Sequence, residues 1–360
     1  MQTSQDEVIA WLRLTLVPGI GSRAQHALLS AFGSPQAVAA ASTHAIAELA
    51  GAQAAQALAR GPDAGLVDAT LSWLSDSGHT LMTLADADYP RALLASGEPP
   101  CVLYVQGRRE LLASPAIAIV GSRNATPQGL RDAEAFARAL SDAGLCVVSG
   151  LAIGIDAAAH RGGLAGASSS IAVMGTGPDR IYPAANRGLA HALAKRGCLV
   201  TEFAVTTPAT VGNFPRRNRL ISGLARGVLV VEAAVRSGSL ITARLAADQG
   251  REVFAIPGSI HSALSKGCHE LIRQGAKLVE SAQDVLLELR MPDAPPPAKA
   301  EDCAPPLLHE MGFAPISIDQ MAERTGLSAA AVSAQLSRLE VEGRIQPLAG
   351  GWFQRIAGSS

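Results

Sequence analysis

Between about residue 90 and residue 290 the chain alternates short apolar runs with amphipathic helical segments. The runs that we expect to form strands are 116–120, 145–149, 170–174, 198–201, 228–231 and 253–256. Segments such as 130–143 and 240–249 have the apolar spacing of helices. Continuous apolar strands that alternate with helices are typical of a parallel sheet covered on both faces. The pattern predicts an α/β fold with a Rossmann-like, doubly wound, mostly parallel sheet. Such sheets bind ligands at the carboxyl ends of their strands.

A helical region precedes this core. Residues 8–74 alternate Ala- and Leu-rich helical patterns with short glycine breaks and carry no strand signal. We expect a small all-α domain over residues 1–88, similar to a sterile-alpha-motif or helix-hairpin-helix domain. Gly19 and Gly21 form a turn before a helix, a place where backbone amides can approach a phosphate. Residues 1–90 carry 3 basic and 8 acidic side chains, a net charge of −5, which favours a packing role without DNA contact.

A second small domain follows the core, which we place at residues 89–290. We predict a Pro-rich linker at 291–306 and a C-terminal winged helix at 307–360. The last domain contains two helical patterns around a Thr-Gly-Leu-Ser turn, and paired glycines then turn a hairpin. Its second helix, expected at 329–342, has Arg338 as its only basic residue. This helix is therefore poorly equipped to grip DNA.

Charge is distributed unevenly along the chain. The whole sequence has a net charge of −1, which by itself argues against a nucleic-acid-binding protein. Residues 91–290 nevertheless carry 22 basic and 15 acidic side chains, a net charge of +7, whereas residues 291–360 have a net charge of −3. A basic middle between acidic ends indicates an anionic partner for the core.

The most informative stretch is 213–223. It lies in a gap of 29 residues, between Glu202 and Glu232, that contains no carboxylate. The arginines in this gap are Arg216, Arg217, Arg219 and Arg226. Arginine suits phosphate, and an aromatic ring beside it, here Phe214, is typical of a groove for single-stranded nucleic acid. The alternative is that these arginines pair with acids elsewhere in the fold and that Phe214 belongs to the core.

The loops that follow the predicted strands are marked by glycine. We expect glycine to let the backbone approach a ligand, while a serine hydroxyl and an arginine fork contact phosphate. The candidate DNA-binding residues in these loops and in the arginine stretch are Gly121, Ser122, Arg123, Asn124, Gly150, Ala152, Gly154, Gly175, Gly177, Phe214, Arg216, Arg217, Asn218, Arg219, Ser237, Gly238 and Ser239. None of the loops is a G-x-G-x-x-G or a Walker loop, so dinucleotide and ATP chemistry have no support.

Support for catalysis is thinner. Asp156 and His160 are one helical turn apart, which suits a hydrogen-bonded pair, although an N-cap role for Asp156 is favoured. Glu232 and the Ser-Gly-Ser helix start at 237–239 could bind a monophosphate. No nucleophile, base and orienting group stand at a convincing spacing. We therefore expect no enzyme activity and no cofactor.

Cysteine usage and the N-terminus indicate the compartment. The five cysteines are widely spaced without a C-x-x-C, so neither a disulfide framework nor a metal site is predicted. The N-terminal stretch begins with Asp6 and Glu7 and is interrupted by Arg13, so we expect no signal peptide. No run of about 18 apolar residues occurs. We expect a cytoplasmic protein.

Read in order, the core motifs resemble the DprA/Smf family of DNA-processing proteins. The stretches are AIVGSRNATPQG (118–129), SGLAIGIDAAAHRGGL (149–164), IAVMGTGPDRIYPAANRGL (171–189), FPRRNRLISGLARGVLVVEAAVRSGSLITA (214–243) and GREVFAIPGSIHSALSKGCHELIRQGAKLV (250–279). They cover most of residues 115–285 in the order of the family. Departures are Thr201 before Glu202, where serine is common, Pro178 in place of leucine, and Ala184, where some relatives have a lysine that contacts phosphate.

The resemblance implies a function. It implies binding of incoming single-stranded DNA in natural transformation, help in loading RecA, and a homodimer formed through the Rossmann-like domain. Arg123 and the segment with Phe214, Arg216, Arg217 and Arg219 are implied as contacts to the strand. Two alternatives stay open. One is a nucleotide phosphoribohydrolase that uses Glu232 on a nucleoside monophosphate, and the other is a protein-interaction scaffold.

Overall fold

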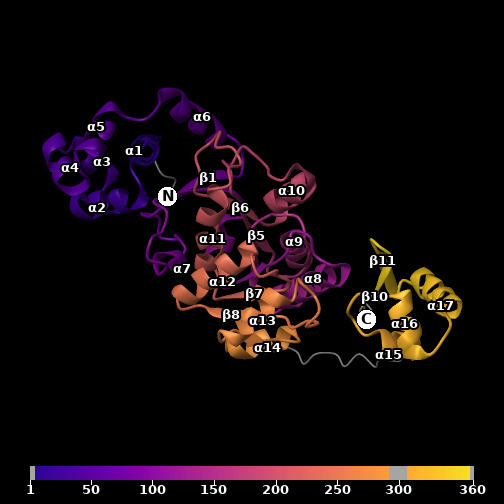
Figure 1. Cartoon of the computed structure of the whole chain (residues 1–360). Coiled ribbons are helices and arrows are strands. Elements are labelled where there is room, and N and C mark those ends of the chain that lie inside the picture. The colour runs from indigo at the N-terminus through magenta and orange to yellow at the C-terminus, as the bar shows by residue number, and fades with distance from the viewer. Residues whose placement is uncertain (1–4, 292–305, 357–360) are drawn as a thin grey trace.

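The computed structural model describes residues 5–291 and 306–356. Its core is a nine-stranded sheet of order β1-β2-β6-β5-β4-β3-β7-β8-β9 (Figure 1). The strands are β1 His79–Thr83, β2 Val102–Gly107, β3 Ala116–Val120, β4 Cys146–Ser149, β5 Ser170–Val173, β6 Cys198–Thr201, β7 Gly227–Val230, β8 Glu252–Ala255 and β9 Lys277–Leu278. The strands from β3 to β9 pair in parallel, and β1 and β2 add an antiparallel edge.

All six predicted strands are present, each within one residue of its expected bounds at either end. Strands β1, β2 and β9 were not predicted from the sequence. Two of these, β1 and β9, are the edge strands, and their polar or very short runs (HTLMT and KL) lack the continuous apolar signal of a strand buried on both faces. Strand β1 falls in the range 1–88, which was expected to be helical, and pairs with β2 in the core sheet.

Helices cover both faces of the sheet, as a doubly wound fold requires. Alternate residues of β3 enter different layers: Ile117 and Ile119 pack on one side, Ala118 and Val120 on the other. The first side carries α8 Pro127–Asp142, α9 Ile155–Ala165, α10 Arg187–Arg196 and α14 Ala282–Glu288. The second side carries α7 Arg91–Leu94, α11 Asn213–Leu224, α12 Gly238–Asp248 and α13 Lys266–Arg273. The predicted fold class is confirmed.

The N-terminal region is a set of short helices that packs on the antiparallel edge of the sheet. Its helices are α1 Gln5–Thr15, α2 Ser22–Phe32, α3 Pro35–Ala40, α4 Thr43–Ala50, α5 Ala52–Arg60 and α6 Ala64–Leu74. Trp11 of α1 and Trp73 of α6 share one hydrophobic cluster with Tyr104 of β2 and with Val205. The Trp73 and Tyr104 rings meet edge to face, with centroids 5.9 Å apart. Helices and sheet are therefore joined by a common core.

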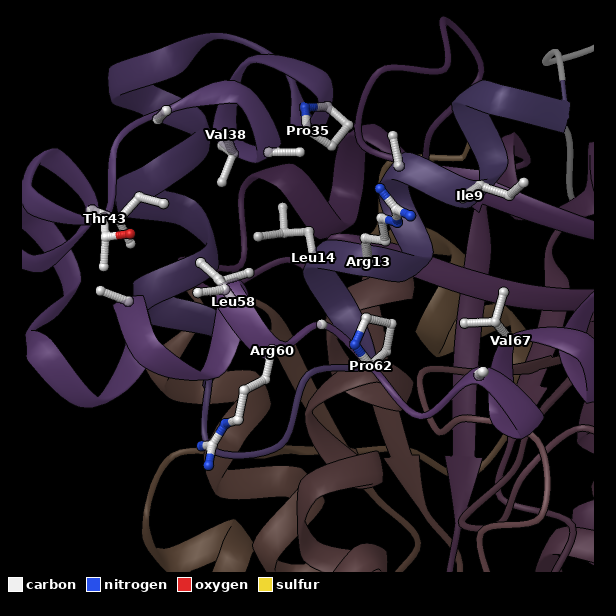
Figure 2. A pocket seen from close by; sticks show the side chains of 18 of the residues that line it. Ile9, Arg13, Leu14, Pro35, Val38, Thr43, Leu58, Arg60, Pro62 and Val67 are labelled. Atoms are coloured by element: carbon white, nitrogen blue, oxygen red, sulfur yellow. The ribbon is translucent and has the colours of Figure 1, made fainter.

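A pocket of 580 Å³ lies among these N-terminal helices (Figure 2). Leu14, Val38 and Leu58 line it together with Arg13 and Arg60. None of the predicted site residues contributes to its lining. The pocket therefore belongs to the helical region alone.

The C-terminal region has the elements of a winged helix (yellow in Figure 1). They are α15 Pro306–Met311, β10 Ile316–Ser317, α16 Ile318–Thr325, α17 Ala329–Val341, β11 Ile345–Leu348 and β12 Trp352–Arg355. Ser317 and Gln320 form a capping box at the start of α16. Gly350 and Gly351, with φ of 82° and 77°, turn the hairpin between β11 and β12.

The predicted linker at 291–306 lies outside the described residues except for its two ends. Among the described helices, none has the length and apolar character to cross a membrane.

Candidate nucleic-acid interface

Helix α11 begins over the carboxyl ends of β4 and β5 and places an aromatic ring there. The ring of Phe214 lies against Gly175, where an added Cβ would stand 2.9 Å from Phe214 Cδ1. Phe214 is half-buried. The ring of Tyr182, a residue that is 51% exposed, lies 5.7 Å from it at an interplanar angle of 40°. The first turn of α11 and the loop after β5 therefore bring two neighbouring rings together at the carboxyl ends of these strands, a region called the strand-end crevice below.

A positive charge faces the same ring. The guanidinium of Arg123, in the loop after β3, lies 5.6 Å from the centroid of Phe214. Arg123 is exposed, and among the described residues no hydrogen bond or ion pair engages its guanidinium. Phosphate can therefore reach this side chain without displacing an internal partner. The structure thus brings together Arg123 and Phe214, as the sequence predicted.

Arg217, by contrast, is buried and has a structural role. Its side chain is buried, and its Nη1 donates to the carbonyl oxygens of Gly150 and Val173 at the ends of β4 and β5. An added Cβ at Gly150 would stand 2.6 Å from that nitrogen. Burial lowers the pKa of Arg217 to about 10, with Asp156 opposing this shift and the charge of Arg123 adding to it. The expectation that Arg217 contacts phosphate does not fit this placement, because the side chain is buried and its Nη1 and Nε already donate within the protein.

The other arginines of the cluster also differ in whether their side chains are bonded within the protein or exposed. Arg219 donates to the Glu202 carboxylate and to the carbonyl oxygen of Glu98. Arg226 donates to the carbonyl oxygen of Leu289 at 2.7 Å. Arg216 stays 65% exposed, with its Nη2 3.8 Å from Glu202 Oε2. The alternative of internal pairing is thus confirmed for Arg219. Its partner, Glu202, is the acidic residue that directly precedes the carboxylate-free gap.

Most glycines of the strand-end loops serve the packing of one loop on another. An added Cβ at Gly121 would stand 2.7 Å from Ile155 Cγ1, and one at Gly177 would stand 2.4 Å from the carbonyl oxygen of Ala204. Gly154, with φ of +80°, has the carbonyl oxygen of Ser122 only 2.3 Å from its would-be Cβ. The expectation that these glycines admit a ligand is corrected, because protein atoms already fill the space.

The polar groups of these loops are partly engaged as well. The Ser122 hydroxyl accepts a hydrogen bond from the Asn124 amide at 3.1 Å, and the Asn124 side chain is exposed. In α11, the Asn218 amide oxygen accepts from Arg217 Nε at 3.1 Å. The Ala152 amide donates to Asp156 Oδ2 at 3.3 Å. Of this group, the Asn124 side chain is the one best placed to meet a ligand.

Asp156 and His160 do not form the predicted pair. Asp156 also accepts from the Gly150 amide at 3.1 Å, so it supports the loop after β4 from within the first turn of α9. His160 is fully buried between Ser170, whose Oγ lies 2.7 Å from Nδ1, and the Leu151 amide, which donates to Nε2 at 3.3 Å. Burial lowers the pKa of His160 to about 3, which keeps the ring neutral. The N-cap of α9 is Gly154, so Asp156 has a structural role but not the expected N-cap one.

Glu232 occupies the switch point of the sheet, between β3 and β7. Its carboxylate accepts from the Thr126 amide at 2.9 Å and from the Thr126 hydroxyl at 2.6 Å, at the start of α8. An added Cβ at Gly129 would stand 2.5 Å from Glu232 Cδ. Doubly wound folds commonly place a ligand phosphate at such a helix start. Here a carboxylate of the chain fills the place, and burial raises its pKa.

The helix start at 237–239 is capped by its own side chain. The Ser237 hydroxyl accepts from the Ser239 amide at 3.3 Å and lies 2.6 Å from the Ser239 hydroxyl. Gly238 is exposed, and an added Cβ there would meet nothing within 4 Å. Gly238 is therefore the member of this motif that leaves room for a ligand.

Comparison with known proteins assigns the family. The model of the DNA recombination-mediator protein A family matches residues 80–290, and the model of the DprA winged helix domain matches residues 291–351. The chain belongs to the DprA/Smf family. The Smf protein of Escherichia coli K12 is 42% identical over 301 residues, which are 80% of each chain. The DNA processing protein DprA of Streptococcus pneumoniae R6 is 46% identical over 206 residues, 57% of this chain and 73% of that protein.

Two solved DprA structures resemble large parts of this chain. The X-ray structure of DprA from Streptococcus pneumoniae has a TM-score of 0.69 and 36% identity over 80% of this chain and 99% of that one. A structure concerned with the single-stranded DNA binding mode of DprA from Helicobacter pylori has a TM-score of 0.53 and 30% identity over 59% of this chain and 96% of that one. The resemblance inferred from the motifs is confirmed.

Within this DprA-family crevice, one exposed residue was missed. Tyr182 follows β5 in the Ile-Tyr-Pro run of a strand-end loop, yet it was not among the candidates. The available signal was an aromatic residue at the mouth of a glycine-marked loop. Its proximity to Phe214 could not be read from the sequence, because the two rings are 32 positions apart.

Proposed function

We propose that this DprA-family protein binds single-stranded DNA at the strand-end crevice. The observation that carries the proposal is the group formed by Arg123, Phe214 and Tyr182. A strand needs a cation for its phosphates and ring faces for its bases, and these side chains supply both without an acid that pairs with Arg123 among the described residues.

Two further observations support this assignment. Helix α11 directs its N-terminus toward the crevice, and helix N-termini favour anions. Its N-cap is Gly212, so no side chain caps the end. Asn124 and Gly238 leave polar or open surface in the neighbouring loops. The crevice thus offers several weak phosphate contacts around one aromatic centre.

Membership of the family supports a wider role. We infer that the protein protects incoming single strands and helps load RecA onto them during transformation and recombination, acting as a homodimer through the Rossmann-like domain. Val235, Ile241 and Ile260 are large apolar side chains that stay exposed in the segment from β7 to α13. A second copy would cover such residues, and a dimer would join two crevices into a longer track.

The alternative of a nucleotide phosphoribohydrolase has less support. Both carboxylate oxygens of Glu232 accept hydrogen bonds from Thr126, and this arrangement closes the helix start of α8. Asp156 and His160 are likewise engaged within the fold. We therefore infer binding without turnover at this site.

A titration of the full chain with labelled oligonucleotides tests the proposal. Single strands and duplexes of several lengths are compared at several salt concentrations. We expect single strands to bind more tightly than duplexes, with little sequence preference and with an affinity that falls steeply with salt. Equal affinity for duplex DNA, an affinity independent of salt, or release of a base from a nucleoside monophosphate would contradict it.

A further inference from the structure

A groove of 440 Å³ lies where the N-terminal helices meet the core. Its wall on the helical side is the turn between α1 and α2, including Gly19, Gly21 and Ser22. On the core side it is lined by Glu202 and Arg216, among others. The groove therefore joins the glycine turn of the N-terminal region to the arginine cluster of α11.

The helix start in this groove is open. Gly21 is the N-cap of α2, so no side chain accepts hydrogen bonds from the first amides of the helix. Gly19 has a φ of +84°, and an added Cβ at either glycine would meet nothing within 4 Å. The core glycines differ, because protein atoms fill the space beside Gly121 and Gly154. The turn thus has room in front of its amides.

Arg216 brings positive charge to this opening. Its guanidinium stacks 5.2 Å from the centroid of Phe203 and remains largely exposed. Arg216 and Arg219 both approach the single carboxylate of Glu202, so these three side chains together carry one net positive charge. The acidic composition of the N-terminal region therefore does not set the charge of the groove.

Within residues 5–291 and 306–356, no group forms a hydrogen bond with two polar side-chain atoms of this groove. The Glu202 side chain is only 8% exposed, and its Oε1 is buried without a hydrogen bond. The Ser22 hydroxyl is also buried without a partner. A buried carboxylate oxygen left unpaired is costly, so it marks a place where a donor from a ligand would be favourable. Nucleobases carry such N–H donors on their edges, next to a phosphate backbone.

We propose that this groove binds one nucleotide of a single strand that also occupies the crevice. The phosphate lies on the α2 amides and Arg216, and a base N–H donates to Glu202 Oε1. This inference rests on the proposed function and extends the DNA track from α11 onto the N-terminal region. It gives that region a direct contact with DNA, where the net charge of residues 1–90 favoured packing alone.

Substitution of the N-cap tests the inference. Gly21 has the extended backbone of an N-cap residue (φ −77°, ψ 168°), so Gly21→Asp places a carboxylate on the α2 amides without strain. We expect the variant to unfold at the same or a higher temperature and to bind long oligonucleotides about tenfold more weakly. A short oligonucleotide that fills only the crevice keeps its affinity.

Two further variants serve as controls. Gln53→Asp adds the same charge to the exposed first turn of α5, which lies outside the groove, and should leave affinity nearly unchanged. Gly21→Asn caps the amides without adding charge and should give an intermediate loss. If Gly21→Asp weakens binding no more than Gln53→Asp, the inference is wrong while the proposed function stands. If the unmodified protein binds no single strand, the proposed function itself fails.

Discussion

The strand-end crevice and the winged helix are both built on folds that commonly bind nucleic acid, yet their cations are placed differently. In the crevice, Arg123 stands over Phe214 with no ion pair among the described residues. In the winged helix, Arg338 of α17 donates to Glu342 at 2.8 Å, one turn further along the chain. We therefore expect an available cation beside a ring, rather than the type of fold, to mark the surface that binds DNA.

The same distinction holds within the core. Arg217 and Arg123 both lie close to the ring of Phe214, at 5.9 and 5.6 Å from its centroid. One is buried and tied to two backbone carbonyls, whereas the other is exposed. We therefore expect substitutions at these arginines to affect different quantities, stability in one case and affinity in the other.

The largest effect is expected for Arg217→Ala. Removing this buried cation leaves the carbonyl oxygens of Gly150 and Val173 without their donor and Asp156 without its countercharge. The free energy of unfolding should fall by about 3–5 kcal/mol, measured by denaturant titration. Arg216→Ala, on the exposed side of the same helix, should change it by no more than about 1 kcal/mol, the size of an exposed cation–π contact. If the Arg217→Ala protein is stable and its slope of log affinity against log salt is reduced, Arg217 contacts phosphate after all.

Arg123→Ala should weaken the binding of single strands without lowering stability. Loss of a charge-assisted contact costs about 1.5–3 kcal/mol, which is about tenfold or more in affinity. The slope of log affinity against log salt should become shallower by about 0.7, the value for one phosphate contact on a single strand. Arg180→Ala is the matched control, because Arg180 is exposed in the neighbouring loop but lies 3.6 Å from Asp179. Equal losses in the two variants would contradict the assignment.

Phe214→Ala separates stacking from charge. Loss of a stacked base should lower affinity by about 1–3 kcal/mol while the salt slope stays nearly unchanged. Because Phe214 is half-buried, the loss of stability should be smaller than the roughly 3–5 kcal/mol expected for Phe203→Ala at a buried position. A large loss of stability with binding intact in the folded fraction would place Phe214 in the core instead.

The smallest effect is expected for Arg338→Ala in the winged helix. The side chain is 82% exposed and its ion pair with Glu342 is a surface pair, worth less than about 1 kcal/mol. Affinity for single strands should stay within about twofold of the unmodified protein, by the same titration. If this substitution weakens binding more than Arg123→Ala, the comparison between the two regions is reversed.

Several elements could be predicted from the sequence because their signal is local. The strands 116–120 and 228–231 are continuous apolar runs, and the hairpin of the winged helix is marked by its two glycines. Strand β1 gave no such signal, since an edge strand need not be apolar on both faces. The rule that ligands meet the carboxyl ends of parallel strands located the expected site, whereas Phe214 was singled out by the arginines beside it and by the family resemblance.

The sequence by itself determined the family, the layered α/β core and the segment that faces the crevice, because periodicity and motif order are properties of neighbouring residues. Only the tertiary structure decided which arginines are available. Arg217 reaches Gly150 across 67 positions, and Arg219 reaches Glu98 across 121. Whether a guanidinium is desolvated and bonded internally depends on such distant partners, and therefore on how the strands and helices pack together.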